Sequence, residues 1–283
     1  MVDFGTCRHE HCGVSSSVLG PGDRVERLLE LRPDVVEWYG LPSSELRAIE
    51  RLAEEHAVRS AVHGPLPFDG LQPPRFAPTS ADPDLAGRAL TMVRETLACA
   101  RALDAIHVVF HFPDPDPPYV RRGFEARARA FLDEVAELSL RYRIPILLEN
   151  MTPNPLLRSP DDYRAVLDRY DELGLCLDLG HAHLTSYPVE EYVEALADRV
   201  ESVHVYNTTP SRYARNGHEP IGEDQDAAEG WLDWRADLLG LLTVATPRAL
   251  VLEHDGRHGP DSSVRAVTGL RALVAWARSK EPA

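Results

Sequence analysis

The sequence predicts an α/β protein in the form of a single (β/α)8 TIM barrel, with residues 1–283 as one domain. Eight extended apolar segments alternate with eight helical segments, at about 35 residues per pair, as in parallel strands joined by crossover helices. Most of the extended segments end in a histidine or an acidic residue. No linker, low-complexity tract or internal repeat divides the chain. At this length the pattern favours a closed barrel over an open doubly wound sheet.

The predicted strands are short runs of apolar and β-branched residues bounded by charged residues, glycine or proline. Pro145 stands near the start of one run, where its missing N–H is tolerated. In chain order the strands are expected at residues 2–7, 34–39, 58–63, 105–111, 144–150, 174–178, 201–206 and 249–253.

The predicted helices repeat apolar residues at helical spacing and begin near residues that can cap them. In the second helix, Leu46, Ile49 and Leu52 share one face, and Ser43 or Ser44 is the expected N-cap. The helices are expected at residues 24–31, 43–57, 83–103, 120–141, 159–170, 189–197, 231–242 and 262–278.

Two connections are too long for ordinary turns. The proline-rich residues 64–82 follow one strand, and residues 207–229 follow another. Both lie after the carboxyl end of a strand, on the barrel face where active sites form. We expect a lid or binding loop from the first connection. From the second we expect phosphate-binding side chains, Arg212 and Arg215.

The composition excludes several functions. A formal net charge of −15 argues against non-specific nucleic-acid binding, so no nucleic-acid partner is expected. No apolar run approaches the roughly 20 residues that cross a bilayer, and no signal peptide is visible, so we expect a cytoplasmic protein without a membrane partner. Lys280 is the only lysine, which excludes a Schiff-base mechanism. The four cysteines are too few for a disulfide framework.

The polar residues that end the predicted strands indicate the function. The carboxyl ends of parallel barrel strands meet at one rim, so their side chains converge. Imidazole and carboxylate groups are ligands for Zn²⁺, Mn²⁺ and Fe²⁺, and without a cation the packed acids would repel one another. The set consists of Glu37, His63, His111, Glu149, Asp178, His181, His204 and Glu253, with His218 on the loop after the seventh strand.

The motifs around these residues, taken in order, resemble the xylose-isomerase-like barrel superfamily, which includes endonuclease IV and many sugar-phosphate isomerase or epimerase-type proteins. The resemblance covers essentially the whole chain. It is carried by Val-His63-Gly-Pro, Phe-His111-Phe-Pro, Leu-Glu149-Asn150, Leu-Asp178-Leu-Gly-His181-Ala-His183, Val-His204-Val, His218-Glu-Pro-Ile-Gly222 and Leu-Glu253-His254.

The resemblance to endonuclease IV implies two or three divalent ions per chain. His63 and His111 would hold one ion, with Glu149 bridging to a second. The second ion would be completed by Asp178, His204 and Glu253.

His181 and His218 would hold a third ion by the same resemblance. The family's third-site Asp-x-His is Asn216-Gly217-His218 here, and a neutral amide is a poorer ligand for Zn²⁺ than a carboxylate. The third ion is therefore expected to be weakly bound, absent or completed by other residues. The substitutes that the sequence offers are His183 and the cluster of Cys7, His9, His11 and Cys12.

The main functional hypothesis is hydrolysis of a phosphoester at a di- or trinuclear site. Adjacent ions lower the pKa of a bridging water and bind the attacking and leaving oxygens. The presence of both His63 and His111 favours this hypothesis, because a single-metal site would need only Glu149, Asp178, His204 and Glu253. The loop after His63 reads Gly-Pro-Leu-Pro-Phe, without groups suited to probing a DNA duplex. A small phosphorylated or sugar-like substrate is therefore expected.

The alternative is isomerisation or epimerisation of a sugar or sugar phosphate around one ion. Glu149 and Glu253 would then transfer a proton on opposite faces of a carbonyl. Side chains expected to contact the substrate are Trp38, Asn150 and His183, in addition to the two arginines. A third alternative is a non-catalytic barrel that only binds metal or ligand. The oligomeric state is left open.

Overall fold

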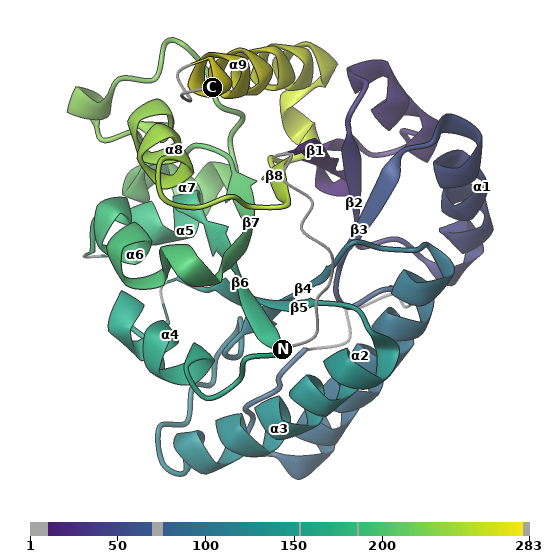
Figure 1. The fold of residues 1–283 in the computed structure, drawn as a ribbon, viewed down its shortest axis with the longest axis vertical. Coiled ribbons are helices and arrows are strands. Elements are labelled where there is room, and N and C mark those ends of the chain that lie inside the picture. Colours follow the sequence, from purple (N-terminus) through teal and green to yellow (C-terminus); the bar gives the residue numbers. More distant parts are fainter. Residues whose placement is uncertain (1–10, 70–75, 153, 186, 280–283) are drawn as a thin grey trace.

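The computed structural model describes residues 11–69, 76–152, 154–185 and 187–279 of the chain. Within these residues eight parallel strands pair in sequence order, and the last pairs with the first (Figure 1). The sheet therefore closes into the TIM barrel that the alternating pattern predicts. The strands are β1 (His11–Ser15), β2 (Val35–Tyr39), β3 (Arg59–His63), β4 (Val108–Phe112), β5 (Ile146–Asn150), β6 (Leu173–Asp178), β7 (Val200–Val205) and β8 (Ala249–Leu252).

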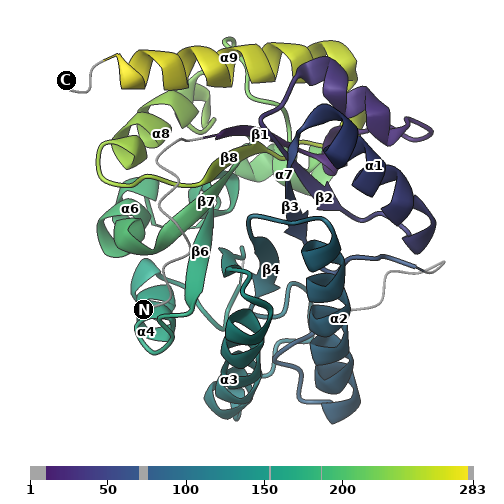
Figure 2. The ribbon, with the colours of Figure 1, turned by 45° about the vertical axis from the view of Figure 1, so that its right-hand side comes forward.

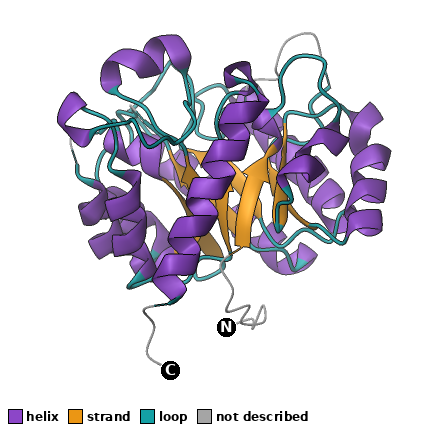
Figure 3. Cartoon of the chain, turned by 90° about the horizontal axis from the view of Figure 1, so that it is seen from above, coloured by secondary structure: helices purple, strands orange, loops and turns teal. Residues whose placement is uncertain are grey.

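Helices surround the barrel on all sides (Figures 1 and 3). The long helices α2 and α3 lie side by side on one flank, and α9 lies beside α8 and β1 on another (Figure 2). The connection from β1 to β2 contains two 3-10 helices, Ser16–Val18 and Val25–Leu31. None of the described helices is both long enough and apolar enough to span a membrane. The α-helices are α1 (Leu46–His56), α2 (Pro83–Ala102), α3 (Phe124–Tyr142), α4 (Pro160–Leu167), α5 (Leu179–His183), α6 (Val189–Leu196), α7 (Pro210–Asn216), α8 (Trp234–Leu242) and α9 (Pro260–Arg278).

The core has two parts because successive side chains of each strand point to opposite sides of the sheet. One set faces the helices and forms the main apolar core, which includes Trp38 of β2 and Phe110 of β4. The other set fills the barrel. Its apolar members include Val35 and Val251 in one cluster and Leu147 in another. Towards the carboxyl ends of the strands, the inward positions become polar.

The first strand lies later in the chain than the sequence suggested. The segment expected to form it, residues 2–7, lies outside the described residues, and β1 is His11–Ser15. Only Cys12 and Val14 are apolar in this strand, so its pattern is weak. A Cβ on Gly13 would approach Val251 Cγ2 to 3.2 Å and the Val35 carbonyl oxygen to 3.3 Å. The glycine allows close packing inside the barrel.

Two short helices follow strand ends where we expected loops. Asp178, the last residue of β6, caps α5 because its Oδ1 accepts a hydrogen bond of 2.6 Å from the His181 backbone N–H. Helix α7 begins at Pro210, a favourable first helical residue. Both helices bring rim residues over the mouth of the barrel: His181 from α5, and Tyr213 from α7.

Candidate metal centre

Four consecutive strands place one polar side chain each around a point inside the barrel mouth. Glu149 and Asp178 lie at the ends of β5 and β6, His204 lies in β7, and Glu253 follows β8. The pairing of β6 with β7 sets Asp178 beside His204. One ligand atom from each residue lies within 4.8 Å of the others, so the group can hold a metal ion. All four residues are buried. We call these residues the four-ligand group.

Each member of the four-ligand group has at least one buried polar atom without a hydrogen-bond partner: Glu149 Oε1, Asp178 Oδ2, both ring nitrogens of His204, and Glu253 Oε2. Leaving a buried polar atom unpaired costs about 1–3 kcal/mol, and carboxylates this close also repel one another. A divalent cation between them would relieve both effects. The donor set of three carboxylates and one imidazole suits Zn²⁺, Mn²⁺ or Fe²⁺. The residues therefore fit the ion that the sequence implies.

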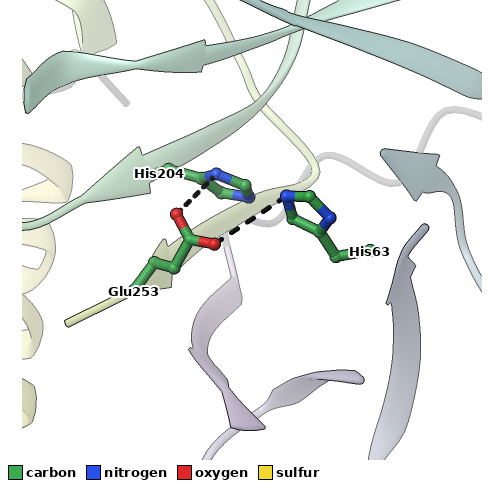
Figure 4. Close-up of side chains that lie close together, drawn as sticks. All are labelled: His63, His204 and Glu253. Carbon is green, nitrogen blue, oxygen red and sulfur yellow. Dashed lines mark ion pairs between the residues drawn. The ribbon is translucent and has the colours of Figure 1, made fainter. Parts of the chain in front are cut away.

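A second group of potential ligands adjoins the first through Glu149. His63 at the end of β3 places Nε2 at 2.9 Å from Glu149 Oε2, and His111 of β4 places Nε2 at 3.4 Å from the same oxygen. These three residues also satisfy the geometry of a metal site. Figure 4 shows that His63 and His204 both face Glu253, at 3.8 Å from Oε1 and 3.1 Å from Oε2 respectively.

Three histidines of the rim are oriented by backbone carbonyl groups. The Nδ1 atoms of His63, His181 and His218 lie 3.2, 3.0 and 2.9 Å from the carbonyl oxygens of Gly64, Asn150 and Glu253, respectively. An Nδ1–H that donates to a carbonyl leaves Nε2 with the lone pair in the neutral ring. In each ring, Nε2 is therefore the atom available to an ion, a substrate or a rim residue.

His181 and His218 lie close together, with ring centroids 5.7 Å apart. His181 Nε2 contacts the Tyr213 hydroxyl at 3.2 Å, and the Asn216 amide donates to Glu219 Oε1 at 2.9 Å. Among the described residues, no group of three or more potential ligands includes His181 or His218. The expected third ion therefore has only these two imidazoles as potential ligands, and Asn216 is engaged elsewhere.

Burial and nearby charge shift several pKa values at the rim. Burial, with Glu149 and Glu253 adding to it, raises the pKa of Asp178 to about 6. Burial disfavours the imidazolium of His181, but Asp178 and Glu149 outweigh it and raise the pKa of His181 to about 9. Burial lowers the pKa of His111 to about 4, which leaves this ring neutral near pH 7, as a metal ligand must be.

The residues expected to contact a substrate lie in different places. Trp38 is fully buried in the main core, where Nε1 donates to Ser60 Oγ at 3.0 Å, so it does not reach the rim. The His183 ring lies 2.9 Å from the Gly230 carbonyl oxygen through Nε2, in contact with the loop after β7. The Asn150 side chain bonds the backbone of Asp178.

The two arginines of the long loop differ. Arg212 binds Glu219 through two hydrogen bonds of 2.6 and 2.8 Å, and its guanidinium carbon lies 4.8 Å from the centre of the Trp231 ring. This guanidinium is thus engaged within the loop, whereas Arg215 is exposed to solvent.

The amino-terminal cluster lies away from the rim as far as it is described. His11 and Cys12 begin β1 and pair with Ala249 and Leu250, the first residues of β8. They occupy the amino end of the barrel, opposite the four-ligand group, and cannot complete a third ion there. Cys7 and His9 lie outside the described residues.

Three groups near the centre were given no specific position in the site from the sequence. Glu37 was grouped with the strand ends, but it lies inside the barrel, paired with Ala61 in register and 3.0 Å from His204 Nε2. His107, just before β4, lies behind it at 3.7 Å. Tyr206 stacks on His218 with ring centroids 3.7 Å apart. Alternation along β2 puts Val35 and Glu37 on the same face, and the structure shows that this face lies inside the barrel.

Comparison with known proteins gives three findings. A relative described as a probable endonuclease 4 from Akkermansia muciniphila is 25% identical over 162 residues, which cover 52% of this chain and only 57% of that relative. The structure of an L-ribulose 3-epimerase matches with a TM-score of 0.75 at 18% identity, over 96% of this chain and 97% of that one. A structure of the IOLI protein with a binding zinc atom matches with a TM-score of 0.72 at 14% identity, over 95% and 98%.

The two structural matches show similarity of fold alone, because their sequence identities are low. A family model described as "Xylose isomerase-like TIM barrel" matches residues 25–279, which include all of the rim residues described above. The chain belongs to the xylose isomerase-like TIM barrel family.

Proposed function

We propose that the protein is a metal-dependent isomerase or epimerase of a sugar or sugar phosphate. The observation that carries the proposal is the four-ligand group, in which every member has a buried polar atom without a hydrogen bond. A single ion could be held by one ligand atom from each of the four residues. Similarity over nearly the whole chain to an L-ribulose 3-epimerase supports a small sugar as the substrate class. This was the alternative hypothesis from the sequence, and the comparisons support it better than phosphoester hydrolysis.

The chemistry requires a group that removes a proton from the carbon next to a carbonyl and a group that returns one. Glu149 and Glu253 are proposed for these two roles, because both carboxylates border the same space inside the mouth. The ion would polarise the neighbouring oxygens of the substrate. Asp178 and Glu149 outweigh burial and raise the pKa of His181 to about 9, which favours the protonated ring, and His181 is proposed to donate that proton to a substrate oxygen.

Proton exchange in D₂O tests this proposal without knowledge of the final product. Protein loaded with Mn²⁺ is incubated with a panel of free and phosphorylated ketoses, and proton NMR follows the signals of the carbons beside the carbonyl. We expect exchange into at least one sugar and no exchange with Glu149→Gln or Glu253→Gln. Glu201→Gln, which alters an acid paired with Arg248 at the opposite end of β7, is the control and should retain exchange.

Phosphoester hydrolysis is the second candidate, favoured by the group of His63, His111 and Glu149. A second ion held there would share Glu149 with the first, as two-metal hydrolysis requires. The endonuclease-like relative supports this candidate over part of the chain.

Counting ions separates the two candidates. Two tight ions per chain, together with phosphate release from a small phosphoester that disappears in His63→Ala and His111→Ala, would support hydrolysis. One ion, together with sugar-proton exchange that survives in both variants, would exclude the hydrolase hypothesis. His56→Ala, at an exposed position at the end of α1, controls for the loss of a histidine.

A further inference from the structure

Glu37 is a carboxylate buried in the middle of the barrel, one layer below the four-ligand group. The residue has no solvent exposure, and neither carboxylate oxygen has a conventional hydrogen bond. Its oxygens face two imidazoles. His204 Nε2 lies 3.0 Å from Oε1, and His107 Nε2 lies 3.7 Å from Oε2. Both histidines are fully buried as well.

His204 bridges this carboxylate and the four-ligand group through its two ring nitrogens. Nδ1 faces Glu253 Oε2 at 3.1 Å and Glu149 Oε2 at 3.7 Å, while Nε2 faces Glu37. A neutral imidazole carries one hydrogen, and the partner of that nitrogen decides which nitrogen holds the lone pair. A hydrogen on Nε2 would leave the Nδ1 lone pair directed at the metal position.

His204 thereby differs from the other rim histidines in which ring nitrogen faces the metal position. His63, His181 and His218 hold their Nδ1 atoms near backbone carbonyls, and the Nε2 atoms of His63 and His181 contact the side chains of Glu149 and Tyr213. Among the ion pairs of the described residues, Glu37 is the acid that faces Nε2 of His204, and the Cys176 thiol also interacts with this ring. Glu37 thus replaces a neutral carbonyl with a full negative charge, at the one histidine that belongs to the four-ligand group.

We propose that Glu37 is a positioning residue, which keeps the hydrogen of His204 on Nε2 and presents the Nδ1 lone pair to the ion. The proposal rests on the metal-binding part of the proposed function and not on the identity of the sugar. A carboxylate behind a metal-bound histidine fixes the ring orientation and strengthens the ligand, and its loss typically weakens metal binding 10–100-fold.

Fold stability alone does not account for Glu37. Replacing a buried ionic group by a neutral group of similar volume is often neutral or stabilising. A purely structural carboxylate here would be one of the less favourable ways to fill the barrel, since the alternate inward positions Val35 and Val251 are apolar. A role in holding the ion explains why an acid lies beneath the metal ligand.

The test compares metal affinity with stability in the metal-free protein. Glu37→Gln keeps the side-chain volume but removes the charge, and its amide can also donate to Nε2 and so favour the wrong tautomer of His204. We expect Zn²⁺ affinity, measured by competition with a chromophoric chelator, to fall about 10–100-fold. Thermal unfolding of the metal-free variant should match or exceed the wild type. Glu201→Gln is the matched control on β7 and should retain full affinity.

Two results would overturn the proposal. One is equal Zn²⁺ affinity in Glu37→Gln and the wild type. The other comes from ¹⁵N-histidine NMR of the zinc-loaded wild type, which needs no variant to fold: we expect hydrogen on Nε2 of His204 and zinc on Nδ1, and the reverse arrangement would refute the role of Glu37. Failure of the wild type to bind any ion would remove this inference and the proposed function together. Absence of sugar chemistry in a protein that binds zinc would remove only the latter.

Discussion

The side chain of Asn150 holds the backbone of Asp178 at both of its polar groups. Its Nδ2 donates to the Asp178 carbonyl oxygen at 3.0 Å, and its Oδ1 accepts from the Asp178 N–H at 2.7 Å. The carbonyl of Asn150 also lies 3.0 Å from His181 Nδ1. One residue at the end of β5 thus positions a member of the four-ligand group and a histidine of the rim.

Asn150→Ala should therefore weaken both stability and metal binding. The change leaves two buried backbone groups without partners, which costs about 1–3 kcal/mol for each group that water cannot reach. Asp178 is no longer fixed, so Zn²⁺ affinity should fall by about 10-fold, measured by chelator competition.

The control for this variant is Asn154→Ala. Asn154 makes the same kind of bracket, with Nδ2 donating to the Asp114 carbonyl at 2.9 Å and Oδ1 accepting from the Leu156 N–H at 2.9 Å. It touches no member of the four-ligand group among these contacts. It should lose stability but retain affinity, and an equal loss of affinity in the two variants would show that Asn150 has no special link to the ion.

Metal binding should weaken as the pH falls. The pKa values of His63 and His204 are raised, because Glu149, Glu253 and Glu37 outweigh the effect of burial, and the pKa of Asp178 is raised to about 6. Protons therefore compete with the ion on these ligands. We expect Zn²⁺ binding, followed by calorimetry, to be tighter at pH 8 than at pH 5.5 and to release protons. Binding that is independent of pH would place the ion elsewhere.

Removal of the ion should destabilise the protein by mass action. A ligand that binds only the folded state at a hundred times its dissociation constant stabilises that state by about 2.7 kcal/mol. Excess chelator should accordingly lower the melting temperature. Equal melting temperatures with and without Zn²⁺ would contradict the four-ligand group as a metal centre.

Asp237, outside the four-ligand group, should make stability depend on pH. Burial, with Glu190 and Asp233 nearby, raises the pKa of this residue of α8 to about 6. A carboxyl group whose pKa is raised on folding is favoured in its protonated form in the folded state. Its contribution to stability is full below about pH 4 and is lost as the pH rises through about 6. Asp237→Asn should therefore be more stable than the wild type at pH 8, by about 1 kcal/mol once solvent screening is allowed for, and equal to it at pH 3.5.

The matched change is Asp261→Asn, which removes an exposed acid from the first turn of α9, where negative charge is favourable. It should give no gain in urea unfolding at pH 8. A gain of equal size would mean that reduced net charge, not the environment of Asp237, is responsible.

Arg212 should contribute to stability rather than to phosphate binding. Its guanidinium donates two hydrogen bonds to the carboxylate of Glu219, a residue that is only 7% exposed. Arg212→Ala removes two N–H donors from that carboxylate and leaves it the Asn216 amide, and hydrogen bonds to charged groups contribute about 1.5–3 kcal/mol. We expect a loss of this order in urea unfolding, against less than 0.5 kcal/mol for the exposed Arg215→Ala. Unchanged stability with weaker phosphate binding would restore the role that the sequence suggested.

The sequence predicted the barrel and the gathering of polar side chains at its mouth for a clear physical reason. Parallel strands end on one rim, so polar residues that terminate apolar runs must converge there. Glu149, Asp178, His204 and Glu253 belong to that converging set, and the resemblance to endonuclease IV is what assigned them to an ion. It could not determine how many ions they hold, because that depends on distances of a few tenths of an ångström.

The predictions that were wrong about where a side chain points have a different physical cause. A shift of one residue along a strand exchanges the two faces. Trp38 and Glu37 are adjacent in β2, and only the structure shows that the tryptophan faces the helices while the acid faces the barrel. The loop residues Arg212 and Asn216 were assigned to the rim, but both bind Glu219, a pairing that depends on the turn at α7.

The number and position of bound ions is the most direct test of the account. Anomalous diffraction from crystals equilibrated with Zn²⁺ or Mn²⁺ measures both at once. We predict that the ion at the strongest anomalous peak is coordinated by Glu149, Asp178, His204 and Glu253 together, with Nδ1 of His204 as its nitrogen ligand. Crystals saturated with metal that show no peak at this position, or ions bound only by His63 and His111, would contradict it.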